Sequence, residues 1–411
     1  MLNQISFFDG TQPFRNDKPI RLIELFAGYG SQALALKYLG VPFEHYRISE
    51  WATKSIQAYK DIHAATDKTD YSKGLTIDEI KAWLANKISF DYNTPASEAQ
   101  INRMGKKTAR QLYNAMRATR NVGSITQATA SDLAIEHTDK FLYILTYSFP
   151  CQDLSSAGGG AGMSKGSGTR SGLLWEVERL LRECKELPQV LLMENVPQVV
   201  GSGAIRDFAQ WLEILEKLGY KNYRRLMNAK DYGIPQNRNR CFMVSILGDH
   251  FYTFPQPREL QYRLKDFLDR HVDEKYYLSD ETIEMFIEHT EKQRAKGNGF
   301  KFEPTDGEGY AKSILTRSGE RPCDNFIKEQ CDGVMLGTSA SHNAGLCADM
   351  SRSITTESKN GIVEFGGGDS FGVVVGKSAA FQRGPLRDVS RTIDTNGSNG
   401  VLLWTKQDAD K

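Results

Sequence analysis

Short apolar runs separated by helix-like segments dominate the first 250 residues. The segment 31–40, "SQALALKYLG", has helical spacing and ends on a glycine, a common residue just after a helix. Strands that alternate with helices in this way predict a doubly wound α/β sheet with parallel strands. The apolar runs expected to form its strands are 20–26, 46–49, 141–147, 190–193 and 241–247.

Residues 61–120 interrupt this alternation with a mostly polar, helical insertion. Its last part, 101–120, carries six Lys or Arg residues and no acid. A solvated helix face and an arm that contacts DNA phosphates both fit this charge. The alternation weakens again beyond about residue 250, so we expect one domain over 1–250 and a second over 251–411.

The second domain contains three similar short segments, 312–316, 352–356 and 391–395. The last two are followed by Asn-Gly turns and by the strand-like runs "GIVEF" and "GVLLW". This pattern predicts a small β-rich domain of repeated hairpins. Its Thr, Ser, Asn and Arg side chains would suit base-edge contacts or would cap turns.

Composition narrows the class of protein without deciding it. The chain has 411 residues and a formal net charge of +1, which favours no particular partner. No apolar run approaches the roughly 18–20 residues of a membrane span, and the N-terminus lacks the features of a secretory signal. The six cysteines show no Cys-x-x-Cys pair, so we expect a reduced, cytoplasmic chain without a metal site.

A glycine turn follows the first strand. It reads Gly28-x-Gly30-x-x-Ala33, and Glu50 lies twenty residues beyond Gly30, after the next strand. This spacing is typical of a nucleotide-binding crossover in which the acid binds ribose hydroxyls. Trp51 offers a flat face for adenine, although a tryptophan at this position fits the core equally well. The cofactor could be a dinucleotide or S-adenosylmethionine.

Two reactive side chains follow two other predicted strands. Cys151 lies in "SFPCQDLSS" after the run 141–147, and Glu194 follows 190–193 in "MENVP". Parallel strands bind ligands at their carboxyl edge, so both side chains should face one pocket. A thiol and a carboxylate there indicate covalent catalysis with proton transfer rather than hydride transfer.

The segment "QNRNR" places Gln236, Arg238 and Arg240 at alternate positions entering the run 241–247. Alternate side chains of a strand point to one face, so the two guanidinium groups should be aligned. Such a pair suits an anion or a pyrimidine carbonyl oxygen, while a solvated pair on an edge strand is the plainer alternative.

Taken in order, "LFAGYGS", "SEW", "SFPCQDLS", "RSGLLWE", "MENVP" and "QNRNR" resemble the DNA (cytosine-5) methyltransferases of bacteria and phages. The resemblance covers residues 20–247 apart from the insertion. It implies a Rossmann-like sheet that uses S-adenosylmethionine, followed by a smaller β-rich target-recognition domain. It also implies sequence-specific methylation of double-stranded DNA.

The resemblance also assigns roles to residues. Cys151 would attack carbon 6 of a cytosine flipped out of the duplex, and Glu194 would hold a proton on the ring nitrogen. Arg238 and Arg240 would bind the cytosine carbonyl or a nearby phosphate. The glycine-rich loop after Cys151 would close as a lid. The implied cofactor contacts are Phe26, Gly28, Tyr29, Glu50, Trp51, Pro150, Leu173 and Asn195, and the implied DNA contacts are Gln152, Ser155, Lys165, Arg170 and Gln236.

The sequence departs from the family pattern in three places. The glycine turn ends in Ser31, where the family usually has a second glycine. Ser124 stands where the family commonly has an aspartate that contacts adenine. The family's "R-x-L-T-P-R-E"-like helix and its final "G-N-S/A-V" segment do not appear before Lys411. We therefore expect either a methyltransferase active alone or a truncated or two-part form that needs a second polypeptide. A cognate restriction endonuclease is a further expected partner.

Overall fold

The computed structural model describes residues 12–154, 162–269, 272, 274–299, 301–314 and 321–328, together with five strands between 333 and 405. The chain forms two compact units, Met1–Asn228 with Asn239–Gln256 and Ala229–Arg238 with Pro257–Lys411. This division differs from the predicted boundary near residue 250, because the loop 229–238 groups with the second unit.

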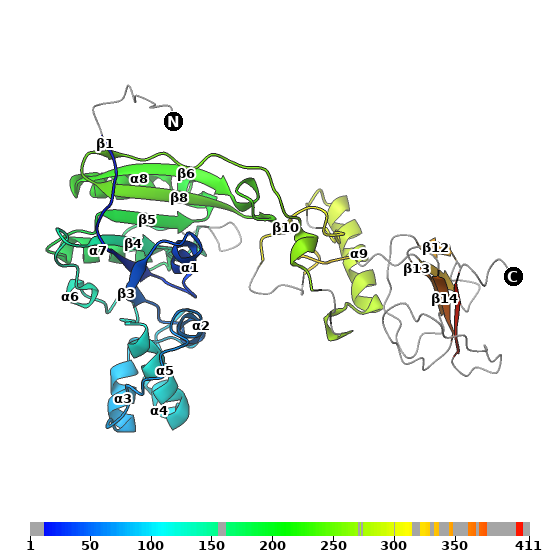
Figure 1. The fold of residues 1–411 in the computed structure, drawn as a ribbon, viewed down its shortest axis with the longest axis horizontal. Coiled ribbons are helices and arrows are strands. Elements are labelled where there is room, and N and C mark those ends of the chain that lie inside the picture. The colour runs from blue at the N-terminus through cyan, green and yellow to red at the C-terminus, as the bar shows by residue number, and fades with distance from the viewer. Residues whose placement is uncertain are drawn as a thin grey trace. The chain divides into compact units, whose positions relative to one another are not determined.

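A six-stranded sheet forms the centre of the first unit (Figure 1). Strands β3, β2, β4 and β5 are parallel, whereas β8 is antiparallel to both β5 and β6. The predicted α/β sheet is confirmed, but the expectation of parallel strands is wrong for β8. Only residues 229–238 join β6 to β8. Parallel neighbouring strands need a longer crossover connection, so β8 runs antiparallel to β6. In sheet order the strands are β3 (Phe43–Ser49), β2 (Ile20–Leu25), β4 (Leu142–Tyr147), β5 (Val190–Asn195), β8 (Asn239–Leu247) and β6 (Tyr220–Asn228).

Helices cover both faces of this sheet. On one face, α7 (Leu174–Glu183) and α8 (Ile205–Lys217) pack on alternate strand residues such as Tyr147. The indole Nε1 of Trp211 donates to the Tyr147 hydroxyl at 3.1 Å in this core. On the other face, α1 (Ser31–Tyr38) and α2 (Thr53–His63) meet Glu24 of β2.

The predicted insertion is a helical subdomain with its own small core. Helices α3 (Ile77–Leu84), α4 (Glu98–Arg103) and α5 (Lys106–Ala118) pack together with α2. Two isolated bridges, Ile48 with Asn121 and Ala52 with Ser89, attach the subdomain at the carboxyl end of β3. The insertion therefore begins and ends at the edge of the sheet where ligands are expected.

The six cations of residues 101–120 divide into two groups. Arg110 donates to the carbonyl groups of Ser72 and Leu75, and Arg120 forms an ion pair with Glu44. These two stabilise the fold. The other four are exposed, which fits either interpretation of this segment; they are Arg103, Lys106, Lys107 and Arg117.

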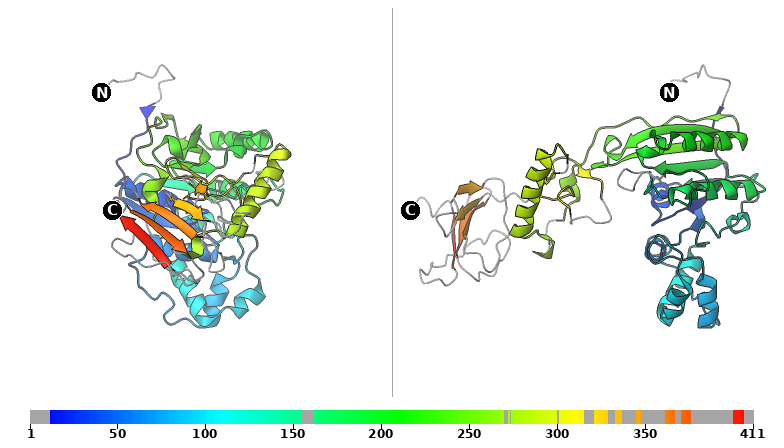
Figure 2. Two further views of the ribbon diagram at one scale, coloured as in Figure 1. Left: turned by 90° about the vertical axis from the view of Figure 1, so that its right-hand side faces the viewer. Right: turned by 180° about the vertical axis from the view of Figure 1, so that it is seen from behind.

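The second unit contains α9 (Asp280–Ala295), which the sequence analysis missed, and an antiparallel sheet. Phe286 of this helix packs against Phe302 and Phe326, which also pack against each other. The runs "GIVEF" and "GVLLW" are confirmed as strands, and Figure 2 shows them flanking β14. Of the three repeated segments, 352–356 and 391–395 lie outside the described residues. In order the strands are β12 (Gly345–Cys347), β11 (Gly333–Leu336), β13 (Gly361–Gly366), β14 (Ser370–Val375) and β15 (Gly400–Thr405).

The remaining elements are short. Helix α6 spans Ala130–Leu133, β1 (Gln12–Pro13) pairs with β9 (His250–Phe251), and β7 (Gln236–Asn237) pairs with β10 (Ala311–Lys312). Within the residues described above, we find no helix with the length and apolar character needed to cross a membrane.

Candidate active site

The predicted catalytic and cofactor residues of the first unit gather at one edge of its sheet. Strands β2, β3, β4 and β5 are parallel, so they all end there. Strand β8 is antiparallel and therefore begins there, with Cys241 opposite Asn195. This edge carries Phe26, Gly28, Glu50, Trp51, Cys151, Glu194, Asn195 and Arg240.

The Cys151 loop is tied to the end of β5. The side-chain amide of Asn195 donates to the carbonyl of Phe149 at 3.0 Å, and its oxygen accepts the Val196 N–H at 2.8 Å. Asn195 is buried, so this amide fixes the backbone two residues before the half-buried Cys151. Asn195 thus holds the thiol loop, and its expected contact with the cofactor stays a prediction.

Glu194 and Arg240 form an ion pair at the same edge. The Arg240 Nε lies 2.9 Å from a Glu194 carboxylate oxygen, and about one fifth of each side chain is exposed, 19% and 20%. The strand register explains the pair: Glu194 lies opposite Phe242, and Arg240 is two residues before it on the same face. The Arg240 guanidinium thus holds the Glu194 carboxylate in a fixed position at this edge of the sheet.

The predicted alignment of Gln236, Arg238 and Arg240 is interrupted. The Arg238 N–H donates to the Gln236 carbonyl at 2.9 Å, which closes a tight turn, and β8 begins only at Asn239. Gln236 and Arg238 belong to the second unit. Of the three residues, only Arg240 therefore lies in the unit that contains Cys151.

The glycine turn closes onto Glu50. One carboxylate oxygen of Glu50 accepts the Gly28 N–H at 2.8 Å, and the other accepts the Ala52 N–H at 2.7 Å. Burial raises the pKa of this carboxyl. Phe26 has a φ of 58°, which is unusual for a residue with a side chain and marks backbone strain at this turn.

Helix α2 packs against the glycine turn and the strand that precedes it. The Tyr59 hydroxyl donates to Glu24 at 2.6 Å, and Glu24 also accepts the Ala33 N–H of α1 at 3.2 Å. The His63 Nε2 lies 2.9 Å from the Tyr29 carbonyl oxygen. Burial raises the pKa of Glu24 to about 7. These supporting residues could not be predicted from the sequence, because no local pattern indicates how α2 packs on the sheet.

We expect Gly30→Ala to destabilise the protein far more than Gly28→Ala. Both glycines have a positive φ, which costs alanine about 1–2 kcal/mol. At Gly30 the new Cβ would also lie 2.3 Å from His63 Nε2, adding roughly 1–3 kcal/mol of overpacking. At Gly28 it would meet no atom within 4 Å. Urea unfolding of both variants measures the difference, and equal losses would contradict the packing of α2 on the turn.

The other predicted cofactor residues lie around the same edge. Phe26 and Leu173 are partly buried against the main core, and Tyr29 is 59% exposed. The Trp51 carbonyl accepts the Ser89 N–H at 2.7 Å, which brings the insertion beside this segment. Pro150 is half-buried next to Cys151. Ser124 is buried, and its hydroxyl lies 2.9 Å from that of Thr126.

The described part of the predicted lid is held by the protein. The Trp175 Nε1 donates to the Met163 carbonyl at 2.7 Å. Lys165 pairs with Glu178 at 2.6 Å, and Arg170 donates to Asn93 of the insertion at 2.5 Å. Both predicted phosphate contacts thus have protein partners in this conformation. Ser155 lies outside the described residues, whereas Gln152 falls in the turn directly after Cys151.

No group of three or more His, Cys, Asp or Glu side chains suited to a metal ion occurs among the residues that the structure describes.

The chain matches one known protein family and is similar to several named proteins. Residues 87–361 match the sequence pattern of the C-5 cytosine-specific DNA methylases. The type II methyltransferase M2.ScrFI of Lactococcus lactis subsp. cremoris is 39% identical over 267 residues, which cover 64% of this chain and 71% of the relative. The orphan methyltransferase M.SssI of Spiroplasma monobiae is 38% identical over 267 residues, covering 64% and 68%. A crystal structure of S. pombe Dnmt2 methyltransferase gives a TM-score of 0.46 at 15% identity, covering 79% of this chain and 78% of that one.

Proposed function

The chain belongs to the C-5 cytosine-specific DNA methylases, and we propose that it methylates carbon 5 of cytosine through a covalent bond between Cys151 and the base. This family methylates cytosine in DNA, and the similar proteins M2.ScrFI and M.SssI are named methyltransferases, so methylation of DNA cytosine is the activity. The observation that supports the covalent route is the shared edge, where Asn195 holds the Cys151 loop and Arg240 holds Glu194.

Cys151 is the proposed nucleophile. Its Sγ, as thiolate, forms a bond to carbon 6 of the cytosine, and the electron pair of the 5,6 double bond moves toward the ring nitrogen N3 and the carbonyl. A proton held between Glu194 and that nitrogen neutralises the developing charge. Carbon 5 becomes enamine-like and nucleophilic. After methylation, the carbon-5 proton passes to water and the N3 proton returns to Glu194, so that the 5,6 double bond re-forms and the Cys151 thiolate is expelled.

Arg240 is proposed to act in two ways. Its guanidinium fixes the direction of Glu194, and its Nη1 donates to the Asn239 carbonyl at 2.7 Å; we propose that N–H donors of this group turn to the base when DNA binds. These donors suit the carbonyl oxygen of the bound cytosine, as the sequence analysis expected. Arg238, which belongs to the second unit, is proposed to contact the base or a neighbouring phosphate of the bound DNA.

The residues of the glycine turn fit S-adenosylmethionine better than a dinucleotide. The Gly28 N–H already donates to Glu50 and is therefore not directed at a pyrophosphate, as the turn of a dinucleotide site would require. The space beside Gly28 is open. We propose that Glu50 binds the ribose, Trp51 the adenine, and Phe26, Tyr29, Pro150 and Leu173 the remaining surface. When bound, S-adenosylmethionine supplies the electrophilic methyl group that carbon 5 accepts.

The target cytosine must leave the base stack to reach a half-buried thiol. We propose that Gln152, Ser155, Lys165 and Arg170 contact the DNA backbone around the flipped base, with Lys165 and Arg170 exchanging their present partners for phosphates. The β-rich second unit, with Gln236 at its start, is proposed to recognise the DNA sequence.

The names of the relatives suggest a biological setting. M2.ScrFI is named a type II methyltransferase and M.SssI an orphan methyltransferase. We propose that this chain belongs to a restriction–modification system, in which a cognate endonuclease would cut the unmethylated site. A second polypeptide required for activity and a cytoplasmic location both stay predictions.

Incubation of the purified chain with duplex DNA and methyl-labelled S-adenosylmethionine tests the proposal. We expect label in 5-methylcytosine at one recurring sequence, which bisulfite sequencing would identify. Label that appears only after addition of a neighbouring gene product would establish the two-part form. Label on another base, or tight binding of a nicotinamide cofactor instead, would overturn the proposed function.

A further inference from the structure

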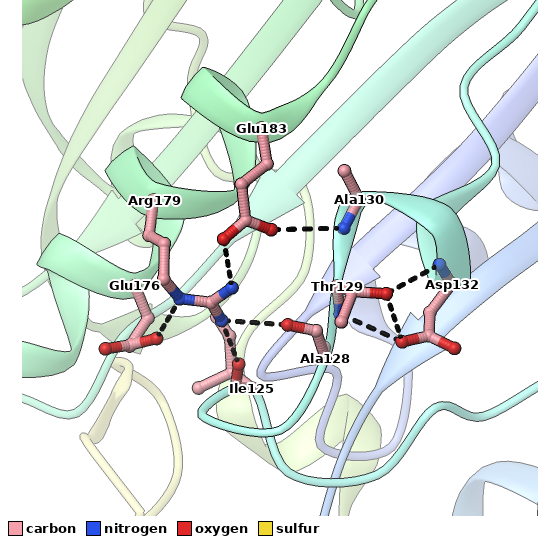
Figure 3. A network of polar contacts seen from close by, with 8 residues as sticks. All are labelled: Ile125, Ala128, Thr129, Ala130, Asp132, Glu176, Arg179 and Glu183. Carbon is pink, nitrogen blue, oxygen red and sulfur yellow. Dashed lines mark hydrogen bonds and ion pairs between the residues drawn. The ribbon is translucent and has the colours of Figure 1, made fainter.

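Arg179 of α7 holds the backbone of a loop that lies far from it in the sequence (Figure 3). Its Nη2 donates to the carbonyl of Ile125 at 3.0 Å and to that of Ala128 at 2.8 Å. Its Nε donates to Glu176 at 2.7 Å, and its Nη1 donates to Glu183 at 2.9 Å. All three nitrogen atoms of the guanidinium are therefore occupied.

The loop held by Arg179 continues directly from a segment that is hydrogen-bonded to Ser49 and Glu50. The Asn121 side chain accepts the Glu50 N–H at 3.1 Å and donates to the Glu50 carbonyl at 2.9 Å. The Ser49 hydroxyl donates to the Gly123 carbonyl at 2.7 Å. Backbone 121–124 thus lies beside the acid proposed to bind the ribose, and residues 125–128 continue it to α7.

We propose that Arg179 is a positioning residue of the cofactor pocket, an inference that rests on the proposed function. The strand end fixes one end of segment 121–128, and Arg179 fixes the other. Together they set where Gly123 and Ser124 stand beside Glu50. Arg179 acts through this backbone and not on the reacting atoms, so its loss should weaken cofactor binding and leave the chemical step unchanged.

The geometry calls for arginine in particular. The planar guanidinium of Arg179 donates to two carbonyl oxygens and two carboxylates at once. The single ammonium group of a lysine cannot make all four contacts. The side chain of Arg179 is 33% exposed and those of its acids 29% and 41%, so solvent weakens the ion pairs. The contacts to the two loop carbonyls are the ones that bear on the pocket.

Three variants separate loop positioning from helix stabilisation. Arg179→Lys keeps the charge but gives up the paired carbonyl contacts. Glu176→Gln with Glu183→Gln removes the acidic charge and keeps acceptors for the fork. Arg182→Met, which removes the neighbouring ion pair with Glu178, serves as the matched control on the same helix.

Calorimetry of S-adenosylmethionine binding to the full chain without DNA is the first measurement, and steady-state methylation is the second. We expect Arg179→Lys to raise both Kd and KM for the cofactor about tenfold, the size of one charged hydrogen bond, with kcat unchanged. The other two variants should match the unsubstituted chain. Amide hydrogen exchange in 123–128 should quicken only in Arg179→Lys.

Two outcomes would contradict the positioning role of Arg179, and a third would bear on the proposed function instead. An unchanged Kd for Arg179→Lys would overturn it. An equal loss in the Glu176→Gln/Glu183→Gln variant would show that the ion pairs, and not the carbonyl contacts, matter. Failure of the unsubstituted chain to bind S-adenosylmethionine would instead count against the proposed function, so the two failures are distinguishable.

Discussion

Cys151→Ser is expected to abolish methyl transfer, with turnover falling by a factor on the order of 10⁴ or more, as when other enzymes lose their nucleophile. A serine hydroxyl is far less acidic and less nucleophilic than a thiol, so it cannot add to carbon 6 at neutral pH. The Asn195 contact is to the Phe149 backbone and is unaffected by this change. Incorporation of labelled methyl groups into DNA measures the loss.

Cys184→Ser is the matched control for this prediction. Cys184 lies at the end of α7, where burial raises its pKa to about 11, so its thiol stays protonated at neutral pH. This variant should methylate DNA normally. Duplex DNA with 5-fluorocytosine at the target should give a protein–DNA adduct with the unsubstituted chain, because no carbon-5 proton can leave, and none with Cys151→Ser. Wild-type turnover by Cys151→Ser would rule out the covalent route.

The shared edge of the sheet could be predicted from the sequence, because the spacing of apolar residues and the order of the strands along the chain determine it. Apolar runs mark the strands, parallel strands end together, and a residue just after a strand lies at their common edge. Cys151 and Glu50 therefore fall where the sequence analysis expected. Glu194 is a small exception, since β5 extends through Asn195. This extension gives Glu194 a strand register and brings Arg240 to it.

The remaining features depend on contacts that no local pattern contains. Strand β8 is antiparallel because the short connection 229–238 reverses the direction of the chain. The turn at Arg238 interrupts the alternation of Gln236, Arg238 and Arg240 that looked regular in the sequence. Lys165 and Arg170 were predicted as DNA contacts, and the structure shows that they have partners on α7 and the insertion. Arg179 looked like any charged residue of an amphipathic helix. Its importance becomes visible only with the two carbonyl groups beside it.

Glu194→Gln is expected to lower kcat by a factor of about 10²–10⁴, the usual contribution of a general acid–base group. Glutamine has nearly the same shape and can still accept a hydrogen bond from Arg240, so the ion pair is lost while the packing is kept. What it cannot do is hold a mobile proton at the ring nitrogen. Attack by Cys151 then leaves negative charge on the base without compensation. Single-turnover methylation with saturating cofactor measures the effect on chemistry directly.

Glu178→Gln is the control that separates proton transfer from loss of a carboxylate. Glu178 is the buried acid of α7 that pairs with Lys165 and Arg182, and it does not lie at the catalytic edge. We expect this variant to keep its turnover. The Glu194→Gln variant should bind DNA and S-adenosylmethionine as the unsubstituted chain does, because the carboxylate contributes to the reacting base more than to binding. A variant that binds DNA poorly but turns over normally at saturating DNA would assign Glu194 to recognition and transfer the proton-holding role to another group.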